Sequence, residues 1–287
     1  MSEYISETKV RELELKANEI RQSIIEMLVA AGSGHTAGPL GMADIFTAMY
    51  FHVLHHDPKN PGMPDRDRFI LSNGHIAPVR YATMAHAGYF PVAELLTLRK
   101  IGSRLQGHPE RERLPGLETT SGPLGSGLGQ AIGMALAARM DGAKWRTYCS
   151  MGDGELDEGI VWESAMLAGK YRLSNLTAIV DRNNIQIDGM TEDVMPLESL
   201  RAKWQAFNWH VIEVDGHNIE AFVDAVQEAK AIYEKPTVII AHTIPGKGIH
   251  EIEFDYKWHG IPPKPAEAKI FLSELRTLHG KIESEHQ

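Results

Sequence analysis

The chain of 287 residues has little of several features that would mark a protein class. Its single cysteine, Cys149, excludes an intramolecular disulfide, and its place in a predicted strand indicates a small buried hydrophobe. No apolar run approaches the length that spans a bilayer, and the first residues are acidic without the pattern of a signal peptide. We therefore expect a cytoplasmic protein that does not contact a membrane.

An excess of positive charge is absent as well. The formal net charge is −9, so we expect no basic face for nucleic acid. An anionic ligand would instead be held by a bound cation, helix N-termini or imidazoles. We find no internal repeat and no low-complexity segment, and the content of 43% hydrophobic and 23% charged residues is that of an ordinary globular protein.

Apolar periodicity predicts strands and helices in alternation. This order is typical of an α/β protein with a doubly wound, mostly parallel sheet and helices on both faces. We expect one domain over residues 1–287, with a glycine-rich loop at 35–41, an extended loop at about 100–128 and a short C-terminal helix and tail. The predicted strands are 68–71, 145–151, 176–180, 209–214 and 236–242, and the predicted helices are 9–31, 42–54, 160–170, 219–233, 266–278 and one that ends near 140.

Polar residues follow two predicted strands that are consecutive in the chain. Gly152-Asp153-Gly154 ends the first, and Asn183 stands just after the second. Because parallel strands hold ligands at their carboxyl edge, both side chains should face one crevice. Two hard oxygen ligands and a backbone carbonyl suit a Mg²⁺ ion that also binds a diphosphate, and the flanking glycines let the backbone approach the phosphates.

Four of the fourteen histidines lie in loops punctuated by glycine or proline: His35, His75, His108 and His259. Their spacing matches no zinc signature. A neutral imidazole can donate to a phosphate or a hydroxyl, or accept a hydroxyl proton near neutral pH. Several imidazoles converging on a polyhydroxylated substrate would suit sugar chemistry.

An ordered series of motifs over most of the chain resembles the amino-terminal, diphosphate-binding domain of transketolase. The series comprises Ser33-Gly34-His35, the run 65–75 that ends in Ser72-Asn73-Gly74-His75, Gly107-His108-Pro109, the run 119–125, the run 151–159 around Gly152-Asp153-Gly154, the run 183–189, and His259-Gly260. The resemblance departs at Thr36, where the family commonly has proline, and at Arg80, where an apolar residue is common.

The resemblance implies a thiamine diphosphate site with Mg²⁺, which Ca²⁺ or Mn²⁺ can replace. Asp153, Asn183 and the carbonyl of Ile185 would bind the metal. The implied cofactor contacts are His75, Gly122, Pro123, Leu124, Gly152, Asp153, Gly154, Glu155, Asn183 and His259. The implied catalytic residues are His35, His75, His108, His259 and Glu158, and the implied substrate contacts are His35, His108, His259 and Arg99.

These residues have distinct roles by resemblance. His108 would stabilise a hydroxyl of the intermediate, and His35 and His259 would transfer protons. Glu158 matches a glutamate near the interface between subunits, and Arg99 matches an arginine near the channel mouth.

The resemblance also implies a second chain, which would carry the pyrimidine-binding and C-terminal transketolase domains. That chain would supply the glutamate that activates the cofactor and further contacts to the sugar phosphate. Two copies of each chain would form a heterotetramer. The implied reaction transfers a two-carbon ketol unit from a ketose or ketose phosphate to an aldose or aldose phosphate, and the sequence leaves the sugars open.

Three other interpretations stay open at this point. The chain could be the alpha chain of a two-chain 2-oxo-acid dehydrogenase, although the Gly107-His108-Pro109 loop and the run 119–125 are not typical of that class. It could be part of a deoxyxylulose-phosphate synthase. A third alternative is a module that binds thiamine diphosphate without catalysis, but such a module has no need of histidines along a sugar channel.

Overall fold

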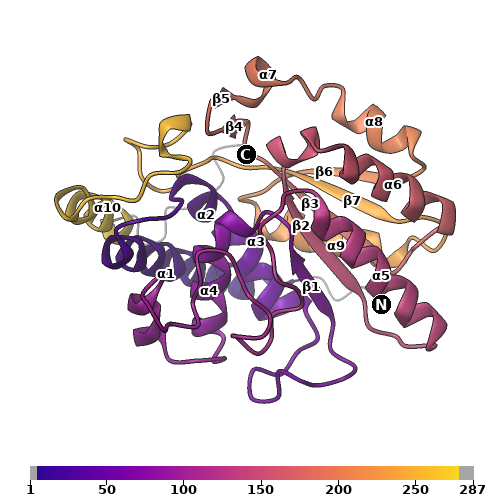
Figure 1. Ribbon diagram of the computed structural model, residues 1–287, viewed down its shortest axis with the longest axis horizontal. Coiled ribbons are helices and arrows are strands. Elements are labelled where there is room, and N and C mark those ends of the chain that lie inside the picture. Colours follow the sequence, from indigo (N-terminus) through magenta and orange to yellow (C-terminus); the bar gives the residue numbers. More distant parts are fainter. Residues whose placement is uncertain (1–4, 278–287) are drawn as a thin grey trace.

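A five-stranded parallel sheet forms the centre of the molecule. The structure, a computed structural model, describes residues 5–277. The strands lie in the order β1-β2-β3-β7-β6, and every neighbouring pair runs parallel (Figure 1). The predicted α/β fold with a doubly wound parallel sheet is confirmed. The strands are β1 (Arg68–Leu71), β2 (Thr147–Gly152), β3 (Leu176–Arg182), β6 (His210–Asp215) and β7 (Thr237–His242).

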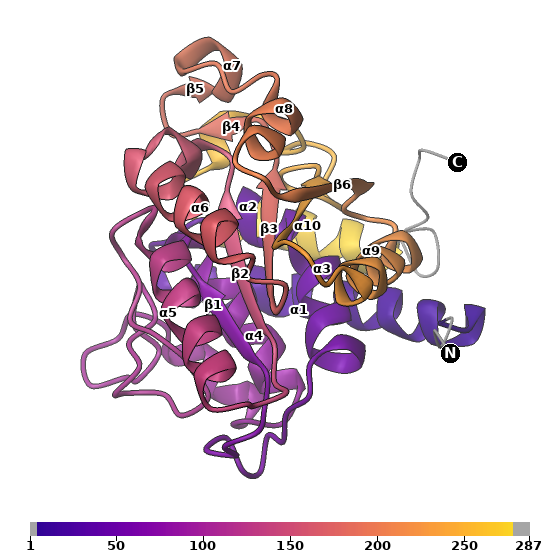
Figure 2. The ribbon, with the colours of Figure 1, turned by 90° about the vertical axis from the view of Figure 1, so that its right-hand side faces the viewer.

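Helices cover both faces of the sheet, as Figure 2 shows for α5 and α6 on one side and α3 and α9 on the other. The first layer contains α5 (Ser126–Met140), α6 (Gly159–Tyr171) and α8 (Leu200–Ala206). The second layer contains α1 (Glu7–Ala31), α2 (Ala37–Gly41), α3 (Ala43–Ala48), α4 (Ala77–His86), α9 (Ile219–Ala231) and α10 (Pro265–Thr277).

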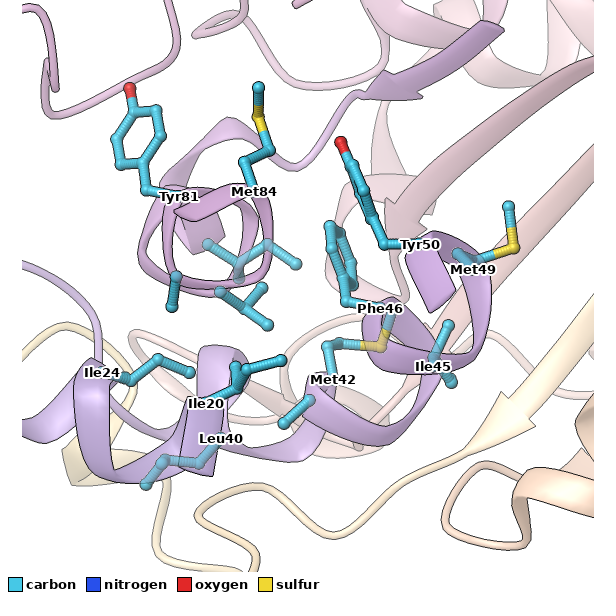
Figure 3. Packing of buried hydrophobic residues seen from close by; sticks show 14 of the residues in the cluster. Ile20, Ile24, Leu40, Met42, Ile45, Phe46, Met49, Tyr50, Tyr81 and Met84 are labelled. Carbon is cyan, nitrogen blue, oxygen red and sulfur yellow. The ribbon is translucent and has the colours of Figure 1, made fainter. Parts of the chain in front are cut away.

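Alternation along the strands separates the two cores. Phe69 faces the core beside α1, α3 and α4, whereas Ile70 faces the core beside α5 and α6. In Figure 3, Ile20 of α1, Phe46 of α3 and Met84 of α4 belong to the same buried cluster. Full burial of one such side chain stabilises the fold by roughly 1.5–3 kcal/mol. This packing fixes β1, whose carboxyl end leads into the site.

Short elements connect the main ones. Several are single helical turns, and β4 and β5 pair as a small antiparallel hairpin beyond the end of β3. Their bounds are η1 (Met49–Val53, a π-helix), η2 (Gly74–Ile76), η3 (Val92–Thr97), η4 (Gly154–Asp157), β4 (Ile185–Gln186), β5 (Gly189–Met190), α7 (Thr191–Val194) and η5 (Tyr256–Trp258). Within residues 5–277, no helix combines the length and the apolar character needed to cross a membrane.

Two predictions near the amino terminus differ from the structure, one in extent and the other in the type of helix. The glycine-rich segment 35–41 contains the short helix α2, and the helix predicted over 42–54 ends as α3 at Ala48 and continues as the π-helix η1. The reason is packing: all five residues of α2 are buried, and a Cβ at Gly41 would lie 2.9 Å from the carbonyl oxygen of Ile244. Gly41 therefore serves close packing rather than loop flexibility.

Strand β1 has the predicted bounds, and the other predicted elements are present with shifted ends. The sequence pattern did not reveal α4, α7, α8 or the hairpin of β4 and β5. Cys149 is fully buried in β2, as expected. The helix predicted over 266–278 is α10, and its last predicted residue lies outside the described residues.

Candidate active site

One pocket lies at the carboxyl ends of β1, β2 and β3, the edge at which parallel sheets bind their ligands. Its cavity has a volume of about 350 Å³. The strand ends contribute polar residues and, just after β1, His75, whereas His35, His108 and His259 come from distant parts of the chain. The lining residues are His35, His75, His108, Gly122, Leu124, Gly152, Asp153, Gly154, Glu155, Asp181, Asn183, Ile185, Gln186, Ile187, Asp188 and His259.

The pocket brings together most of the residues singled out in the sequence. Pro123, Glu158 and Arg99 do not line it. Pro123 lies between two lining residues, and Glu158 is exposed at the N-cap of α6. Four lining residues had received no role from the sequence: Asp181, Gln186, Ile187 and Asp188. Their signal was available, because Asp181 precedes Asn183 by two positions and the other three lie in the run 183–189.

Three of the histidines form a close cluster. The ring centroid of His35 lies 5.0 Å from that of His75 and 5.5 Å from that of His259, and the last two are 5.2 Å apart. The Nδ1 atoms of His35 and His259 are buried and have no hydrogen-bond partner among the described residues. Buried polar atoms are normally satisfied, so these two are available to a ligand.

Burial keeps the histidines of the pocket uncharged at neutral pH. Desolvation, supported by His259, Arg99 and His108, lowers the pKa of His35 to about 4. Burial lowers the pKa of His75 well below its ordinary value and also lowers those of His259 and His108. A neutral imidazole can accept a proton or donate its N–H, so the cluster is suited to proton transfer at a hydroxyl.

Arg99 lies beside the pocket without lining it. Its backbone has a φ of 59°, and a Cβ at Gly107 would lie 2.9 Å from the Arg99 guanidinium carbon. The guanidinium therefore packs across the glycine that precedes His108, and its charge contributes to the lowered pKa of His108. Arg99 thus supplies positive charge next to the histidine loops.

Asp153 is the central carboxylate of the pocket floor. It is 1% exposed, its Oδ1 accepts a hydrogen bond from the Gly154 N–H at 2.8 Å, and its Oδ2 accepts one from the Asn184 N–H at 2.7 Å. The Oδ2 also accepts a hydrogen bond from Nη1 of Arg182 at 3.1 Å. Burial raises the pKa of Asp153, and Arg182 together with the two backbone donors opposes that rise.

Asn183 and Ile185 stand beside this carboxylate. The side-chain oxygen of Asn183 accepts a hydrogen bond from the Ile185 N–H at 3.0 Å, and its amide donates to Asp181 at 2.8 Å. No group of three His, Cys, Asp or Glu side chains that could hold a metal occurs in residues 5–277. Asp153, Asn183 and Ile185 line the same pocket and offer carboxylate, carboxamide and carbonyl oxygens, the donor types that suit Mg²⁺. Among the described residues, Oδ1 of Asp153 accepts one hydrogen bond, from Gly154.

Comparisons with known proteins agree with this geometry. The family model described as transketolase, thiamine diphosphate binding domain, matches residues 13–279. The chain is 46% identical to the 6-deoxy-6-sulfo-D-fructose transketolase subunit SqwG of Clostridium sp. (strain MSTE9), over 92% of this chain and 96% of that protein. It is 39% identical to an apulose-4-phosphate transketolase subunit of Phocaeicola vulgatus, over 97% of this chain and 99% of that protein.

A solved structure shows the same fold at a different chain length. A transketolase variant from Pichia stipitis matches with a TM-score of 0.87 and 35% identity, covering 93% of this chain but 40% of that one. The chain thus spans less than half of that transketolase, whereas it corresponds almost fully to the two relatives that are called subunits. The chain therefore belongs to the transketolase family, as an amino-terminal, thiamine-diphosphate-binding subunit of a split transketolase.

Proposed function

We propose that this protein, with Mg²⁺ and a second chain, transfers a two-carbon ketol unit from a ketose or its phosphate to an aldose or its phosphate. The observation that carries the proposal is the presence of four uncharged histidines in the pocket that Asp153 and Asn183 also line. A diphosphate-binding floor alone would not require that cluster of imidazoles. Proton transfer at sugar hydroxyls does.

The chain's own residues would hold the cofactor in two places. Asp153, Asn183 and the carbonyl of Ile185 would bind Mg²⁺, and the backbone at Gly152 and Gly154 would approach the diphosphate. The loop 122–124 would contact the aminopyrimidine ring. When bound, thiamine diphosphate supplies the nucleophilic carbon and the electron sink needed to break a carbon–carbon bond beside a carbonyl.

The histidines would act on the sugar. His35 and His259, with their unpartnered Nδ1 atoms, would transfer protons at the hydroxyl next to the broken bond. His108 would stabilise the hydroxyl of the transferred unit, and His75 would lie beside the thiazolium ring. Arg99 would attract an anionic group on the substrate, because its positive charge lies next to the loop of His108.

The names of two relatives bear on the class of substrate. One acts on 6-deoxy-6-sulfo-D-fructose and the other on apulose-4-phosphate, so each name joins a sugar to an anionic group. We therefore propose a sugar substrate that bears a phosphate or a sulfonate. The choice between these groups would depend largely on the second chain.

The second chain would cover the outer face of α5 and α6. Large apolar side chains are exposed there and at the adjoining pocket rim: Leu124, Met140, Ile160, Met166, Leu167 and Tyr171. Large exposed apolar side chains that gather on two packed helices in this way support an interaction site. We propose that the partner carries the pyrimidine-binding and C-terminal transketolase domains, and that two copies of each chain assemble.

Isolation of the native complex through a tag on this chain tests the function. Mass spectrometry should identify a second chain, and ketol transfer should require both chains, thiamine diphosphate and Mg²⁺. Removal of Mg²⁺ with a chelator should abolish the transfer, and its return should restore it. A tagged chain that binds the cofactor but emerges alone, with no transfer activity, would contradict catalysis and favour a binding module.

A further inference from the structure

A buried carboxylate connects three segments at the edge of the pocket. Glu155 is 2% exposed and lies in η4, directly after β2. Its Oε1 accepts hydrogen bonds from the Ser72 hydroxyl and from the Gly125 N–H, the latter at 2.6 Å. Its Oε2 accepts a hydrogen bond from the Gly152 N–H at 3.0 Å. The carboxylate therefore joins the ends of β1 and β2 to the start of α5.

The start of α5 is fitted closely to this network. The Ser72 hydroxyl, which donates a hydrogen bond to Glu155, also accepts one from the Gly127 N–H at 3.0 Å. A Cβ at Gly127 would collide with the Cβ of Ser72, so the helix approaches β1 this closely only with glycine there. The carboxylate also faces the N-terminal end of a fifteen-residue helix, where the helix dipole favours negative charge.

The loop before α5 is held at both ends. The Ser121 N–H donates to the Pro109 carbonyl at 3.0 Å, and the Gly125 N–H donates to Glu155. Between these points, Gly122 and Leu124 line the pocket. The same carboxylate also fixes the turn at the end of β2, because it accepts a hydrogen bond from Gly152, whose next residue is Asp153.

We propose that Glu155 is a positioning residue, which sets the loop 122–124 and the turn Gly152–Asp153 as one unit before the cofactor binds. Three donors from the loop and the strand ends already bind its two oxygens, so its hydrogen bonds act on the loop and the turn. This role differs from the direct cofactor contact that the resemblance implies for Glu155. The inference rests on the proposed function insofar as that loop and turn hold thiamine diphosphate. It adds a link between the two ends of the cofactor site.

Glu155→Gln is the direct test, because glutamine has the same size but presents an N–H toward one of the three donors. In the full chain without cofactor, hydrogen exchange over residues 121–128 should become about 10-fold faster. In the reconstituted two-chain enzyme, the Kd for thiamine diphosphate should rise about 10-fold, since hydrogen bonds to a charged group are lost. The kcat at saturating cofactor should fall by a smaller factor than the Kd rises, because excess cofactor compensates for weaker binding.

Glu118→Gln is the matched control. Glu118 is also buried, at 7% exposure, but it pairs with Arg66 outside the pocket. This variant should lose stability without faster exchange over 121–128 and without weaker cofactor binding. If Glu155→Gln does not fold, Ser72→Ala, which removes one donor, should show the same changes at smaller size.

The outcomes separate the two proposals. Wild-type exchange over 121–128 in a folded Glu155→Gln chain would overturn the positioning role, and so would weaker cofactor binding without faster exchange, because that result indicates direct contact. Failure of the wild-type enzyme to bind thiamine diphosphate would instead overturn the proposed function. In that case, faster exchange in the variant would still support the link from Glu155 to the loop.

Discussion

At the scale of single residues, the uncharged state of the histidines is what the site depends on. A proton acceptor must be neutral, and the pKa of His35 is about 4 in the fold against an ordinary value of 6.5. The neutral form is therefore present above the lowered pKa and is lost only as the pH falls through about 4. Packing against His75 and His259, together with the nearby Arg99, maintains this state.

We expect His35→Ala and His108→Ala each to lower the kcat of the reconstituted enzyme by about 10²-fold or more, the usual contribution of a positioned acid or base. In wild type, protonation of His35 should lower kcat/KM only at a pH well below 6.5. Steady-state kinetics over the stable pH range checks both. His55→Ala is the control, because His55 is exposed and does not line the pocket. Unchanged rates in both active-site variants would contradict the assigned roles.

The sequence indicated the histidines but not their environment. Glycine and proline around His35, His75, His108 and His259 pointed to loops with a function. Their mutual distances and lowered pKa values depend on how residues far apart in the chain pack, which no local pattern contains. The same holds for Glu155, whose three donors come from different segments.

At the scale of elements, Arg182 joins the end of β3 to the segment that follows it. Besides Asp153, its guanidinium donates to Glu192 at 2.5 Å and to Glu198 at 3.0 Å, and it is 3% exposed. These bonds hold α7 and the residues before α8 over the side of the pocket formed by β4 and β5. Removal of this buried guanidinium is costly mainly because it leaves the buried carboxylate of Asp153 without its cationic partner, whereas Glu192 and Glu198 are open to solvent.

Arg182→Gln should therefore lower the free energy of unfolding by about 1–3 kcal/mol and speed hydrogen exchange over residues 185–199. Urea unfolding and exchange mass spectrometry measure the two effects. Arg201→Gln on α8 is the matched control, because its pair with Glu213 is partly exposed and should be worth only about 0.2–1 kcal/mol. Equal effects of the two substitutions would show that Arg182 has no special role in this segment.

The elements themselves were predicted correctly where the apolar periodicity of the sequence matches the residues that the fold buries. Residues 68–71 are β1 as expected. Helix α1 ends at Ala31 and is capped by Gly32, whose φ of 65° needs a residue that tolerates the left-handed region. Prediction from the sequence failed between Ile185 and Ala206, where β4, β5, α7 and α8 are too short for a periodic signal. It also failed at α2, where glycines taken as a loop signal serve close packing.

At the scale of the whole molecule, the two helical layers differ in how they meet their surroundings. The exposed residues of α1 are polar apart from Leu15, whereas α5 and α6 carry several apolar residues on the outside as well as toward the sheet. A helix that is apolar all round is normally buried. Because this surface adjoins Leu124 at the pocket rim, a chain that covers it would also reach the pocket.

Met166→Glu tests this surface. Met166 is 58% exposed on α6, so a charge there should leave the free energy of unfolding of the isolated chain within about 0.5 kcal/mol of wild type. A charge buried at the contact should weaken association with the co-purified second chain by at least about 10-fold, measured by sedimentation velocity. Ile270→Glu is the matched control, because Ile270 is 54% exposed on α10 in the opposite layer and should leave association unchanged. If both variants associate like wild type, the second chain does not bind over α6, and the apolar face must be covered in another way.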